Sequence, residues 1–387
     1  MSNKLKICVI VINSVWYDPR VRKQIAEYIR CGHEVSVVGH KCARYDAEKV
    51  KQIPAPTNIV HVTKYEGKQR NPLKKILRER LRNKALTDAI VATKAQVIHA
   101  NDYNALVPAY AAAKKLGCVL VYDSHEICVE NDFSKRLPTV FVRYMRWKEK
   151  RMCRRLDQMV CVSHAAADYF VKAYGIPKPM VVTNCSLARE AVKAGEKHPN
   201  FEILNHGQFY AGRGYDIMVE ASQYLKDYPE IKLAMRGFGV MEQQLRDRTE
   251  ELQADNVVFY PKVLVQELIP LASRSMVGVA VTEAICLNFK LSVSNKLFEY
   301  ASAGLPVIMS DIPEHRYLNE KYGFGIIIPD NSPQAFAEAA IRLYTDKEFY
   351  AKCVEGANRM TKEVNWETEF AGLIEIEKNC VKKCYRG

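Results

Sequence analysis

Residues 294–308 read S-N-K-L-F-E-Y-A-S-A-G-L-P-V-I, and this stretch predicts a short helix that leads directly into a strand. Ser294 is a favourable N-cap, and the A-G-L-P segment ends the helix before the apolar residues of the strand. The free N–H groups and the dipole at the start of such a helix favour a bound phosphate. Lys296 adds a positive charge there, and Glu299 follows about one turn later, where its carboxylate can accept hydrogen bonds from two sugar hydroxyls. These residues alone leave open an ordinary capped helix with a solvated lysine and glutamate.

The same alternation of helix and strand runs through the whole chain. Short apolar strands are followed by longer helices, from the first strand at Leu5–Ile12 to a last helix expected at about 366–387. This order is typical of parallel sheets wound with helices, and 387 residues are enough for two domains, each with its own core. We expect an α/β protein with an N-terminal domain at 1–188, a charged linker at 189–199 and a C-terminal domain at 200–365.

The composition predicts a protein that is made in the cytoplasm and stays there. No run of 18 apolar residues occurs, and the apolar run that ends by Val11 lacks a cleavage site. The 12 cysteines are therefore expected to be reduced. Cys380 and Cys384 are neighbours, but no second pair or histidine stands at zinc spacing from them, so the sequence predicts no metal site.

Positive charge is concentrated in the first half of the chain. Residues 1–200 carry 36 Lys and Arg against 18 Asp and Glu, a net charge of +18, whereas the remaining residues carry 21 against 26, a net charge of −5. This imbalance predicts that the first half faces an anionic partner, either a membrane surface or nucleic acid. Two basic amphipathic helices, expected at 70–94 and 137–156, carry much of this charge. Each fits a solvated face, a membrane surface or a nucleic-acid patch, and the presence of two favours the membrane.

Two loops of the first domain combine histidine with carboxylates. His99 ends one expected strand and is followed by Asn101 and Asp102, and the next strand leads into His125 and Glu126. Both loops leave the carboxyl edge of a parallel sheet, which is where ligands bind in such folds. A single histidine at a strand end is more often hydrogen-bonded scaffolding, but two such clusters on successive strands favour a site.

The stretch at 294–308 closely resembles the C-terminal signature of the family 4 glycosyltransferases, N-K-L-F-E-Y-x-A-x-G-x-P-V-I. These are retaining enzymes of the GT-B fold that use nucleotide sugars, and the resemblance extends over nearly the whole chain. It implies two Rossmann-like domains that face each other across a cleft, with a C-terminal helix that crosses back to the first domain. It also implies that Glu299 binds the ribose of the donor. The resemblance further implies that backbone N–H groups of one turn hold the diphosphate, and this turn is formed by Ser294, Asn295, Lys296 and Leu297.

The resemblance also covers the first domain. Residues 18–21, D-P-R-V, resemble a loop on the acceptor side, although the Gly-Gly pair usual in that loop is absent. The Y-D-x-H-E motif of the family is intact at 122–126, whereas its H-x-H-[DE] motif has Asn101 in place of the second histidine. In the family, that histidine contacts the transferred sugar. In this chain the contact can be made instead by Asn101, Asp102 or His125. The residues to which the resemblance assigns roles here are Asp18 and Arg20 in the acceptor loop and His99, Asn101, Asp102, His125 and Glu126 in catalysis.

In the second domain the resemblance assigns donor-binding roles. Gly207 and Arg213 stand in a glycine-rich loop between strand and helix, and its N–H groups and cation suit a diphosphate. Gly237 stands in a turn expected beside the base. The family often has a further glutamate eight positions before the ribose-binding one, but Leu291 stands there in this chain, so Glu283, the nearest acid, is assigned to the donor sugar.

The activity implied is transfer of a sugar from a nucleoside-diphosphate sugar with retention of configuration and without a cofactor. The chain contains no D-x-D triplet, so we expect a metal-independent enzyme. The basic first domain suggests a lipid-linked saccharide acceptor at the inner face of the cell membrane, as in the synthesis of cell-surface polysaccharides. The alternatives are an inverting transferase or a sugar-nucleotide epimerase of similar fold. A basic protein that binds nucleic acid would leave the motif around Glu299 unexplained.

Overall fold

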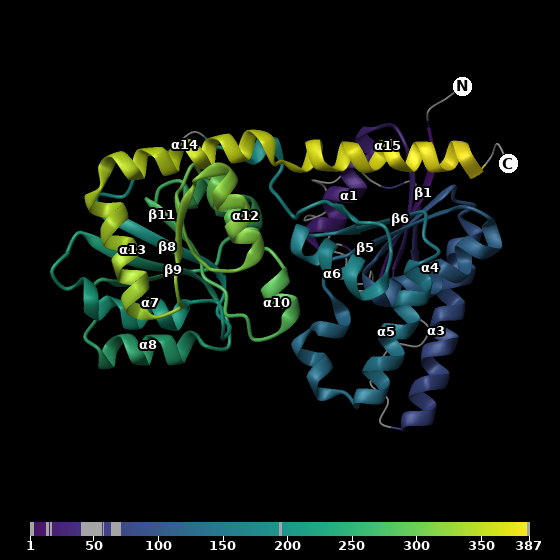
Figure 1. Ribbon diagram of the computed structural model, residues 1–387, viewed down its shortest axis with the longest axis horizontal. Helices are drawn as coiled ribbons and strands as arrows, with labels where there is room; N and C mark the ends of the chain where they lie inside the picture. The colour runs from purple at the N-terminus through teal and green to yellow at the C-terminus, as the bar shows by residue number, and fades with distance from the viewer. Residues whose placement is uncertain are drawn as a thin grey trace. The chain divides into compact units, whose positions relative to one another are not determined.

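The computed structural model describes residues 4–12, 15, 18–39, 56, 58–62, 71–192 and 196–384 (Figure 1). The chain divides into two compact units, an N-terminal unit of residues 1–182 and 369–387 and a C-terminal unit of residues 183–368. The corresponding domain ends expected from the sequence are 188 and 365. Parts of the loop expected at 13–19, and the first residue of the basic helix expected at 70–94, lie outside the described residues.

The strands of the N-terminal unit are β1 (Lys6–Val11), β2 (Glu34–Gly39), β3 (Asn58–His61), β4 (Val97–Asn101), β5 (Val119–Ser124), β6 (Gln158–Cys161) and β7 (Met180–Val181). Within the described residues they form a seven-stranded sheet of order β3-β2-β1-β4-β5-β6-β7. Every pair in it is parallel. Strands β4 and β5 are buried along their whole length, as expected for parallel strands that are covered on both faces.

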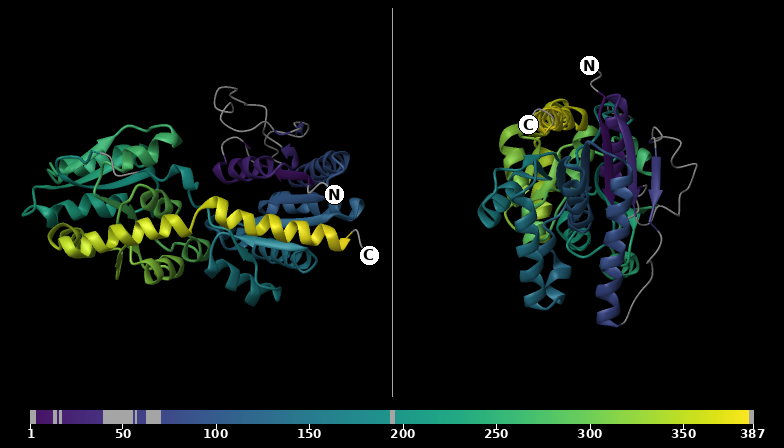
Figure 2. Two further views of the ribbon diagram at one scale, coloured as in Figure 1. Left: turned by 90° about the horizontal axis from the view of Figure 1, so that it is seen from above. Right: turned by 90° about the vertical axis from the view of Figure 1, so that its right-hand side faces the viewer.

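The helices of this unit are α1 (Pro19–Arg30), α3 (Pro72–Ala92), α4 (Asp102–Leu116), α5 (Thr139–Cys153), α6 (His164–Tyr174) and most of α15 (Trp366–Cys384), with short 3-10 turns η2 (Cys128–Glu130) and η3 (Asp132–Arg136). Helix α1 begins where the Asp18 side chain accepts hydrogen bonds from two backbone N–H groups, with a proline at its first position. Helix α15, drawn in yellow, belongs to the N-terminal unit from Glu369 onward (Figure 1 and Figure 2). The C-terminal helix therefore returns to the first unit, as expected.

The strands of the C-terminal unit are β8 (Phe201–Gln208), β9 (Ile231–Phe238), β10 (Val257–Tyr260), β11 (Val277–Ala280), β12 (Val307–Ser310) and β13 (Gly325–Ile328). Within the described residues they form a six-stranded parallel sheet of order β10-β9-β8-β11-β12-β13. Its helices are α7 (Tyr215–Ala221), α8 (Glu242–Glu251), α9 (Val265–Ala272), α10 (Leu287–Leu291), α11 (Asn295–Ser302), α12 (Pro313–Tyr322), α13 (Pro333–Thr345) and α14 (Lys347–Glu363), with 3-10 turns η4 (Ala188–Glu190) and η5 (Ser222–Leu225).

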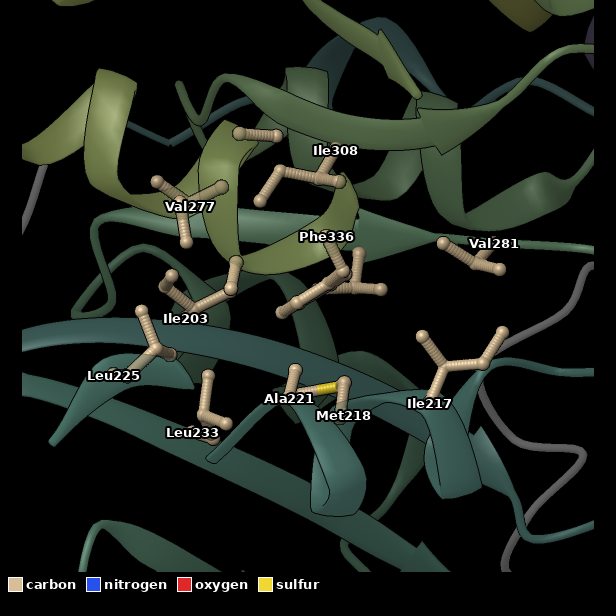
Figure 3. Close-up of a cluster of buried hydrophobic side chains, with 14 of the residues drawn as sticks. Ile203, Ile217, Met218, Ala221, Leu225, Leu233, Val277, Val281, Ile308 and Phe336 are labelled. Carbon is tan, nitrogen blue, oxygen red and sulfur yellow. The ribbon is translucent and has the colours of Figure 1, made fainter. Parts of the chain in front are cut away.

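Apolar side chains from this sheet and its helices form a continuous core in the C-terminal unit. Ile203 of β8 and Val277 of β11 lie on the sheet side of this core, and Met218 of α7 and Phe336 of α13 cover them (Figure 3). On the opposite side, α11 lies close against β11. A Cβ atom at Gly278 would be only 2.2 Å from the Tyr300 ring, so only glycine allows this approach. The glycine thereby fixes the position of α11, which carries Glu299 and Lys296.

Both sheets are doubly wound around their first strand. In the N-terminal unit β1 lies between β2 and β4, and in the C-terminal unit β8 lies between β9 and β11. The strand order reverses at these points, and the loops that leave the carboxyl ends of such strands form the binding crevice of an open α/β sheet. The structure thus confirms two Rossmann-like α/β domains. No helix in the described parts of the chain is both long and apolar enough to cross a bilayer.

Candidate active site

Polar side chains gather at the carboxyl edge of the N-terminal sheet, and we call the following set the N-terminal cluster: Asp18, Arg20, Gln24, Asn101, Asp102, Asp123 and His125. The base of the cluster is buried. Arg20 donates two hydrogen bonds of 2.9 Å to the two carboxylate oxygens of Asp123, and Gln24 Nε2 donates another at 2.9 Å. Burial would raise the pKa of the Asp123 carboxyl, but Arg20 and then His125 outweigh burial and hold it well below its ordinary value. Asp123 is therefore a fixed negative charge.

His99 lies beneath this cluster and is fully buried. Its Nε2 is 2.8 Å from Gln24 Nε2, and its Nδ1 is 2.8 Å from the hydroxyl oxygen of Tyr28. That hydroxyl donates to Glu377 of α15 at 2.5 Å, and the Phe370 ring stacks on the imidazole. Because both ring nitrogens are occupied and the side chain has no exposed surface, His99 cannot contact a substrate. The catalytic role expected for His99 is therefore corrected to that of a positioning residue.

His125 is the central side chain of the cluster and is 14% exposed. Its Nε2 is 3.0 Å from Asn101 Oδ1 and 3.6 Å from Asp123 Oδ2. Its Nδ1 is 3.5 Å from Asp102 Oδ2 and 3.9 Å from Asp18 Oδ2. Burial lowers the pKa of His125, but the carboxylates of Asp102 and Asp123 outweigh burial and raise it to about 9. At neutral pH His125 is thus an imidazolium ion, which can donate hydrogen bonds but cannot accept a proton.

Asn101 and Asp102 differ in their solvent exposure. Asn101 is buried, and its Nδ2 donates to Gln24 Oε1 at 3.0 Å while its oxygen faces His125. Asn101 therefore occupies the place of the missing family histidine as a fixed contact of His125. Asp102 begins α4 with a φ of +68°, a strained value for a residue with a side chain, and its side chain is 35% exposed. Strain of this kind is concentrated at functional positions.

Glu126 is exposed and accepts a hydrogen bond from Asn131 Nδ2 in the loop after β5. Asp18, Arg20, Asn101, Asp102 and His125, by contrast, are brought together as expected. Four residues of this region were not predicted as site residues from the sequence: Gln24, Tyr28, Asp123 and Glu377. The intact Y-D-x-H-E motif already contained Asp123, but a polar residue within a helix, such as Gln24 or Glu377, gives no signal that distinguishes it from a solvated one.

A second set of polar side chains lies in the C-terminal unit around the start of α11, and we call it the C-terminal cluster: Asn205, His206, Arg213, Lys296 and Glu299. Lys296 is half-buried, and its Nζ donates to Asn205 Oδ1 at 2.7 Å. Asn205 Nδ2 in turn donates to the carbonyl oxygen of Arg213 at 3.1 Å, which ties the glycine-rich loop to the helix. Burial, together with the nearby Arg213 charge, lowers the pKa of Lys296 to about 7. Lys296 and the Arg213 cation are thus held near each other, and a bound anion would favour the charged form of Lys296.

Glu299 is anchored by His206, a residue of β8 to which no role was assigned from the sequence. The His206 Nε2 atom and Glu299 Oε2 are 2.7 Å apart, and the backbone N–H of His206 donates to the Tyr300 hydroxyl at 2.9 Å. His206 is buried, whereas the Glu299 side chain is 28% exposed. One carboxylate oxygen is therefore held in place by the protein while the group still reaches solvent. This geometry suits a carboxylate that accepts hydrogen bonds from a pair of vicinal hydroxyls.

The backbone around this cluster also fits an anion. Ser294 stands at the N-cap position of α11, but its side chain forms no capping hydrogen bond, which corrects the capping role expected for it. The first-turn N–H groups are therefore not satisfied by that hydroxyl. Gly237 lies in the last part of β9 and not in a turn, and it pairs with Gly207 of β8. It has a φ of +155°, and a Cβ atom there would be 1.8 Å from the Gly207 carbonyl oxygen, so the ends of the two strands approach each other through glycine. The Glu283 N–H donates to the Gly212 carbonyl oxygen at 3.0 Å, which places Glu283 beside the same loop.

No group of three or more His, Cys, Asp or Glu side chains is arranged to hold a metal ion in the parts of the chain that the structure describes. The positive charges of the C-terminal cluster come from Arg213 and Lys296. The C-terminal cluster can bind an anion next to a hydroxyl-bearing group. The N-terminal cluster can donate hydrogen bonds from the cationic His125.

Two family models match the chain, one to each unit. The Glycosyltransferase Family 4 model matches residues 20–186, and the Glycosyl transferases group 1 model matches residues 200–346. The fold and the matched domains define a glycosyltransferase of the GT-B type. The chain belongs to glycosyltransferase family 4, which confirms the resemblance seen in the sequence. A search of curated protein sequences gives no match.

Solved structures with the same fold include a glycosyltransferase, HepE and a sucrose-phosphate synthase. A glycosyltransferase from Rickettsia africae is 17% identical over 98% of this chain and 100% of its own, with a TM-score of 0.74. HepE from Anabaena, in complex with UDP and glucose, is 16% identical over 96% of this chain and 98% of its own, with a TM-score of 0.72. A sucrose-phosphate synthase from Thermosynechococcus elongatus is 14% identical over 98% of this chain and 100% of its own, with a TM-score of 0.76. At these identities the similarity establishes the fold.

Proposed function

We propose that this glycosyltransferase transfers a sugar from a nucleoside-diphosphate sugar to a saccharide acceptor with retention of anomeric configuration, and that the C-terminal unit binds the donor. One observation carries the proposal: Glu299 is held by His206 at 2.7 Å, in the same short helix whose first turn bears Lys296. The carboxylate accepts the two ribose hydroxyls, and the helix start receives the adjacent diphosphate. The neighbour HepE was solved with UDP, so UDP is the first nucleotide to test.

The diphosphate leaving group gains negative charge as the bond to the sugar breaks. Arg213, Lys296 and the first-turn N–H groups of α11 are fixed in advance at the place where that charge develops, and such preorganised donors supply a large share of catalysis. Glu283, beside the glycine-rich loop, contacts hydroxyls of the donor sugar. Because the two cations come from the protein and no D-x-D motif is present, the proposed reaction needs no metal ion.

The N-terminal cluster contacts the transferred sugar and the acceptor. His125, with a pKa of about 9, is protonated at neutral pH and donates a hydrogen bond to a sugar hydroxyl. A protonated His125 does not remove the acceptor proton, which supports a donor phosphate oxygen as the base. In that step the acceptor oxygen bonds to the anomeric carbon on the face from which the phosphate departs, and its proton passes to the departing phosphate oxygen. Retention of configuration follows from this same-face attack.

The acceptor is proposed to be a lipid-linked saccharide in the synthesis of cell-surface polysaccharide, with the enzyme bound peripherally to the inner face of the membrane. The charge of the first half of the chain supports this, as do exposed apolar side chains on the basic helices α3 and α5, among them Ile76, Leu77, Val140 and Phe141. A soluble acceptor would leave this combination of exposed apolar and basic residues without a role.

The decisive experiment is a thermal-shift screen against UDP-, GDP- and ADP-sugars, followed by analysis of the transfer product. A ligand at about 100 times its Kd stabilises a fold by about 2.7 kcal/mol, which shifts the melting temperature measurably. Nuclear magnetic resonance of the product then gives its anomeric configuration. An inverted product would identify an inverting transferase, and an epimerised nucleotide sugar formed without acceptor would identify an epimerase. Loss of activity on addition of a chelator would refute the metal-independent reaction.

A further inference from the structure

Helix α5 exposes an aromatic face that the fold leaves uncovered. Val140, Phe141, Tyr144 and Trp147 recur at helical spacing, and Val140 is 78% and Trp147 55% exposed. The rings of Tyr144 and Trp147 stack on each other at 6.0 Å between their centroids. Met145 and Met152 of the same helix are buried and attach α5 to the unit. The helix therefore has two apolar faces, one that packs inward and one that has no partner within the described part of the chain.

A hollow lies at the C-terminal end of this aromatic face. It has a volume of about 240 Å³ and is formed by α4 and α5 together with the residues that follow α5. Val107 and Met152 form apolar parts of its wall. The cations that line it are Lys114, Lys148, Arg151 and Arg155, and no acidic residue does so.

The cations of the hollow are unusual for a surface so rich in charged residues. In the described residues none of the four forms an ion pair, although the neighbouring Lys115 pairs with Asp88 at 3.3 Å. Arg151 lies over the Trp147 ring at 5.6 Å, which connects the hollow directly to the aromatic face. Lys148 is partly buried, and burial lowers its pKa although the carboxylate of Glu79 opposes this shift. Positive charges that converge on a concave site, with no carboxylate in its lining, are suited to an anion.

We propose that this hollow binds the phosphate of an anionic phospholipid headgroup, while the aromatic face of α5 enters the membrane interface next to it. The inference rests on the peripheral membrane location in the proposed function and gives it a specific lipid site. A hollow of 240 Å³ is smaller than most drug-sized ligand pockets and suits a headgroup better than a whole saccharide. Tryptophan and tyrosine beside it are the residues that favour the boundary between headgroups and acyl chains.

The position of α3 supports a membrane at this side of the unit. The N-terminal halves of α3 and α5 both extend past the sheet in the same direction (Figure 1 and Figure 2). Ile76 and Leu77 in the first half of α3 are exposed, and the lysines at 74 and 75 precede them. Two helices with exposed apolar tips and basic flanks can therefore approach the same surface.

The test compares two charge-matched variants of the full-length protein in vesicle flotation. Lys148→Gln with Arg151→Gln removes two cations of the hollow, and Arg136→Gln with Arg143→Gln removes two cations in or just before α5 that do not line it. The vesicles are phosphatidylcholine with or without phosphatidylglycerol. We expect the hollow variant to lose at least about tenfold more affinity for phosphatidylglycerol vesicles than the control variant, because a phosphate that contacts several converging cations gains more than one that meets a single screened surface charge. Equal losses in the two variants would overturn the site.

Two further experiments distinguish a lipid site from a free-anion site and test whether the aromatic face inserts into the membrane. Inorganic phosphate and glycerol 3-phosphate are titrated against both variants, and binding that depends on the hollow while flotation does not would identify a free-anion site and overturn the lipid assignment. The fluorescence of Trp147 is expected to shift to the blue with phosphatidylglycerol vesicles, and Trp147→Phe is expected to abolish that shift; an unchanged shift would refute insertion of the aromatic face. UDP binding is measured on every variant. Wild-type protein that floats but binds no nucleotide would refute the proposed function alone.

Discussion

The lowered pKa of Lys296 predicts that donor binding takes up a proton. Its pKa of about 7 in the free protein arises from burial and from the Arg213 charge, and a diphosphate placed beside Lys296 favours the ammonium form. Lys296 is therefore neutral in about half of the free protein molecules at pH 7 and in almost all of them at pH 8, and these molecules must gain a proton when UDP binds. If the complex keeps Lys296 charged, the apparent Kd for UDP rises about 50-fold between pH 7 and pH 9.

Isothermal titration calorimetry of UDP in buffers of different ionisation enthalpy measures both quantities. The wild-type protein is expected to take up approximately half a proton at pH 7 and nearly one at pH 8. Lys296→Arg is the matched control, because a guanidinium stays charged over this range and its binding should not depend on pH through this group. A pH-independent Kd for the wild type would refute the reasoning, and so would the same pH dependence in Lys296→Arg.

Three other predictions follow from the packing and the charges. Arg20→Gln leaves the buried Asp123 carboxylate without its cation, and we expect the free energy of unfolding in urea to fall by about 3–5 kcal/mol; a loss below 1 kcal/mol would contradict the buried pair. Gly278→Ala forces a methyl group into the Tyr300 ring, so unfolding should become easier by about 1–3 kcal/mol and UDP affinity should fall with it, whereas unchanged affinity would show that α11 does not depend on this contact. The pKa of His125 rises from 6.5 to about 9 on folding, so its stabilising contribution is complete below pH 6.5 and is lost as the pH passes 9; His125→Gln should flatten the stability curve in that interval, and an unaltered curve would refute the charge assigned to it.

The helix that carries the proposed donor site could be predicted from the sequence because its signals are local. The helix, its stop and the order of Lys296 and Glu299 within it all lie in one short stretch, and the structure places them on α11 as expected. The anchor of Glu299 could not be predicted in the same way. His206 stands 93 positions away on β8, and it meets Glu299 only because β8 pairs with β11 and α11 packs against β11.

The burial of His99 in the first domain could not be predicted from the sequence either. Its strand-end position suggested catalysis, but its surroundings depend on the contact between Tyr28 and Glu377, residues 349 positions apart in the chain. No local pattern reveals that the C-terminal helix seals this histidine from solvent. The basic helix α5 is a milder case: its amphipathic pattern predicted a helix correctly, but it could not show that Trp147 faces outward while Met145 faces inward.

The central claim is that Glu299 holds the ribose of a nucleoside diphosphate at the start of α11, and a binding cycle tests it most directly. UDP and its 2′,3′-dideoxy analogue are titrated against the wild type and Glu299→Ala, with circular dichroism to confirm that the variant is folded. Hydrogen bonds to a charged group contribute about 1.5–3 kcal/mol each, so the wild type should prefer UDP by at least about tenfold. Glu299→Ala should bind both nucleotides with the same weak affinity. Equal discrimination by the two proteins would show that the ribose is bound elsewhere and would contradict the account.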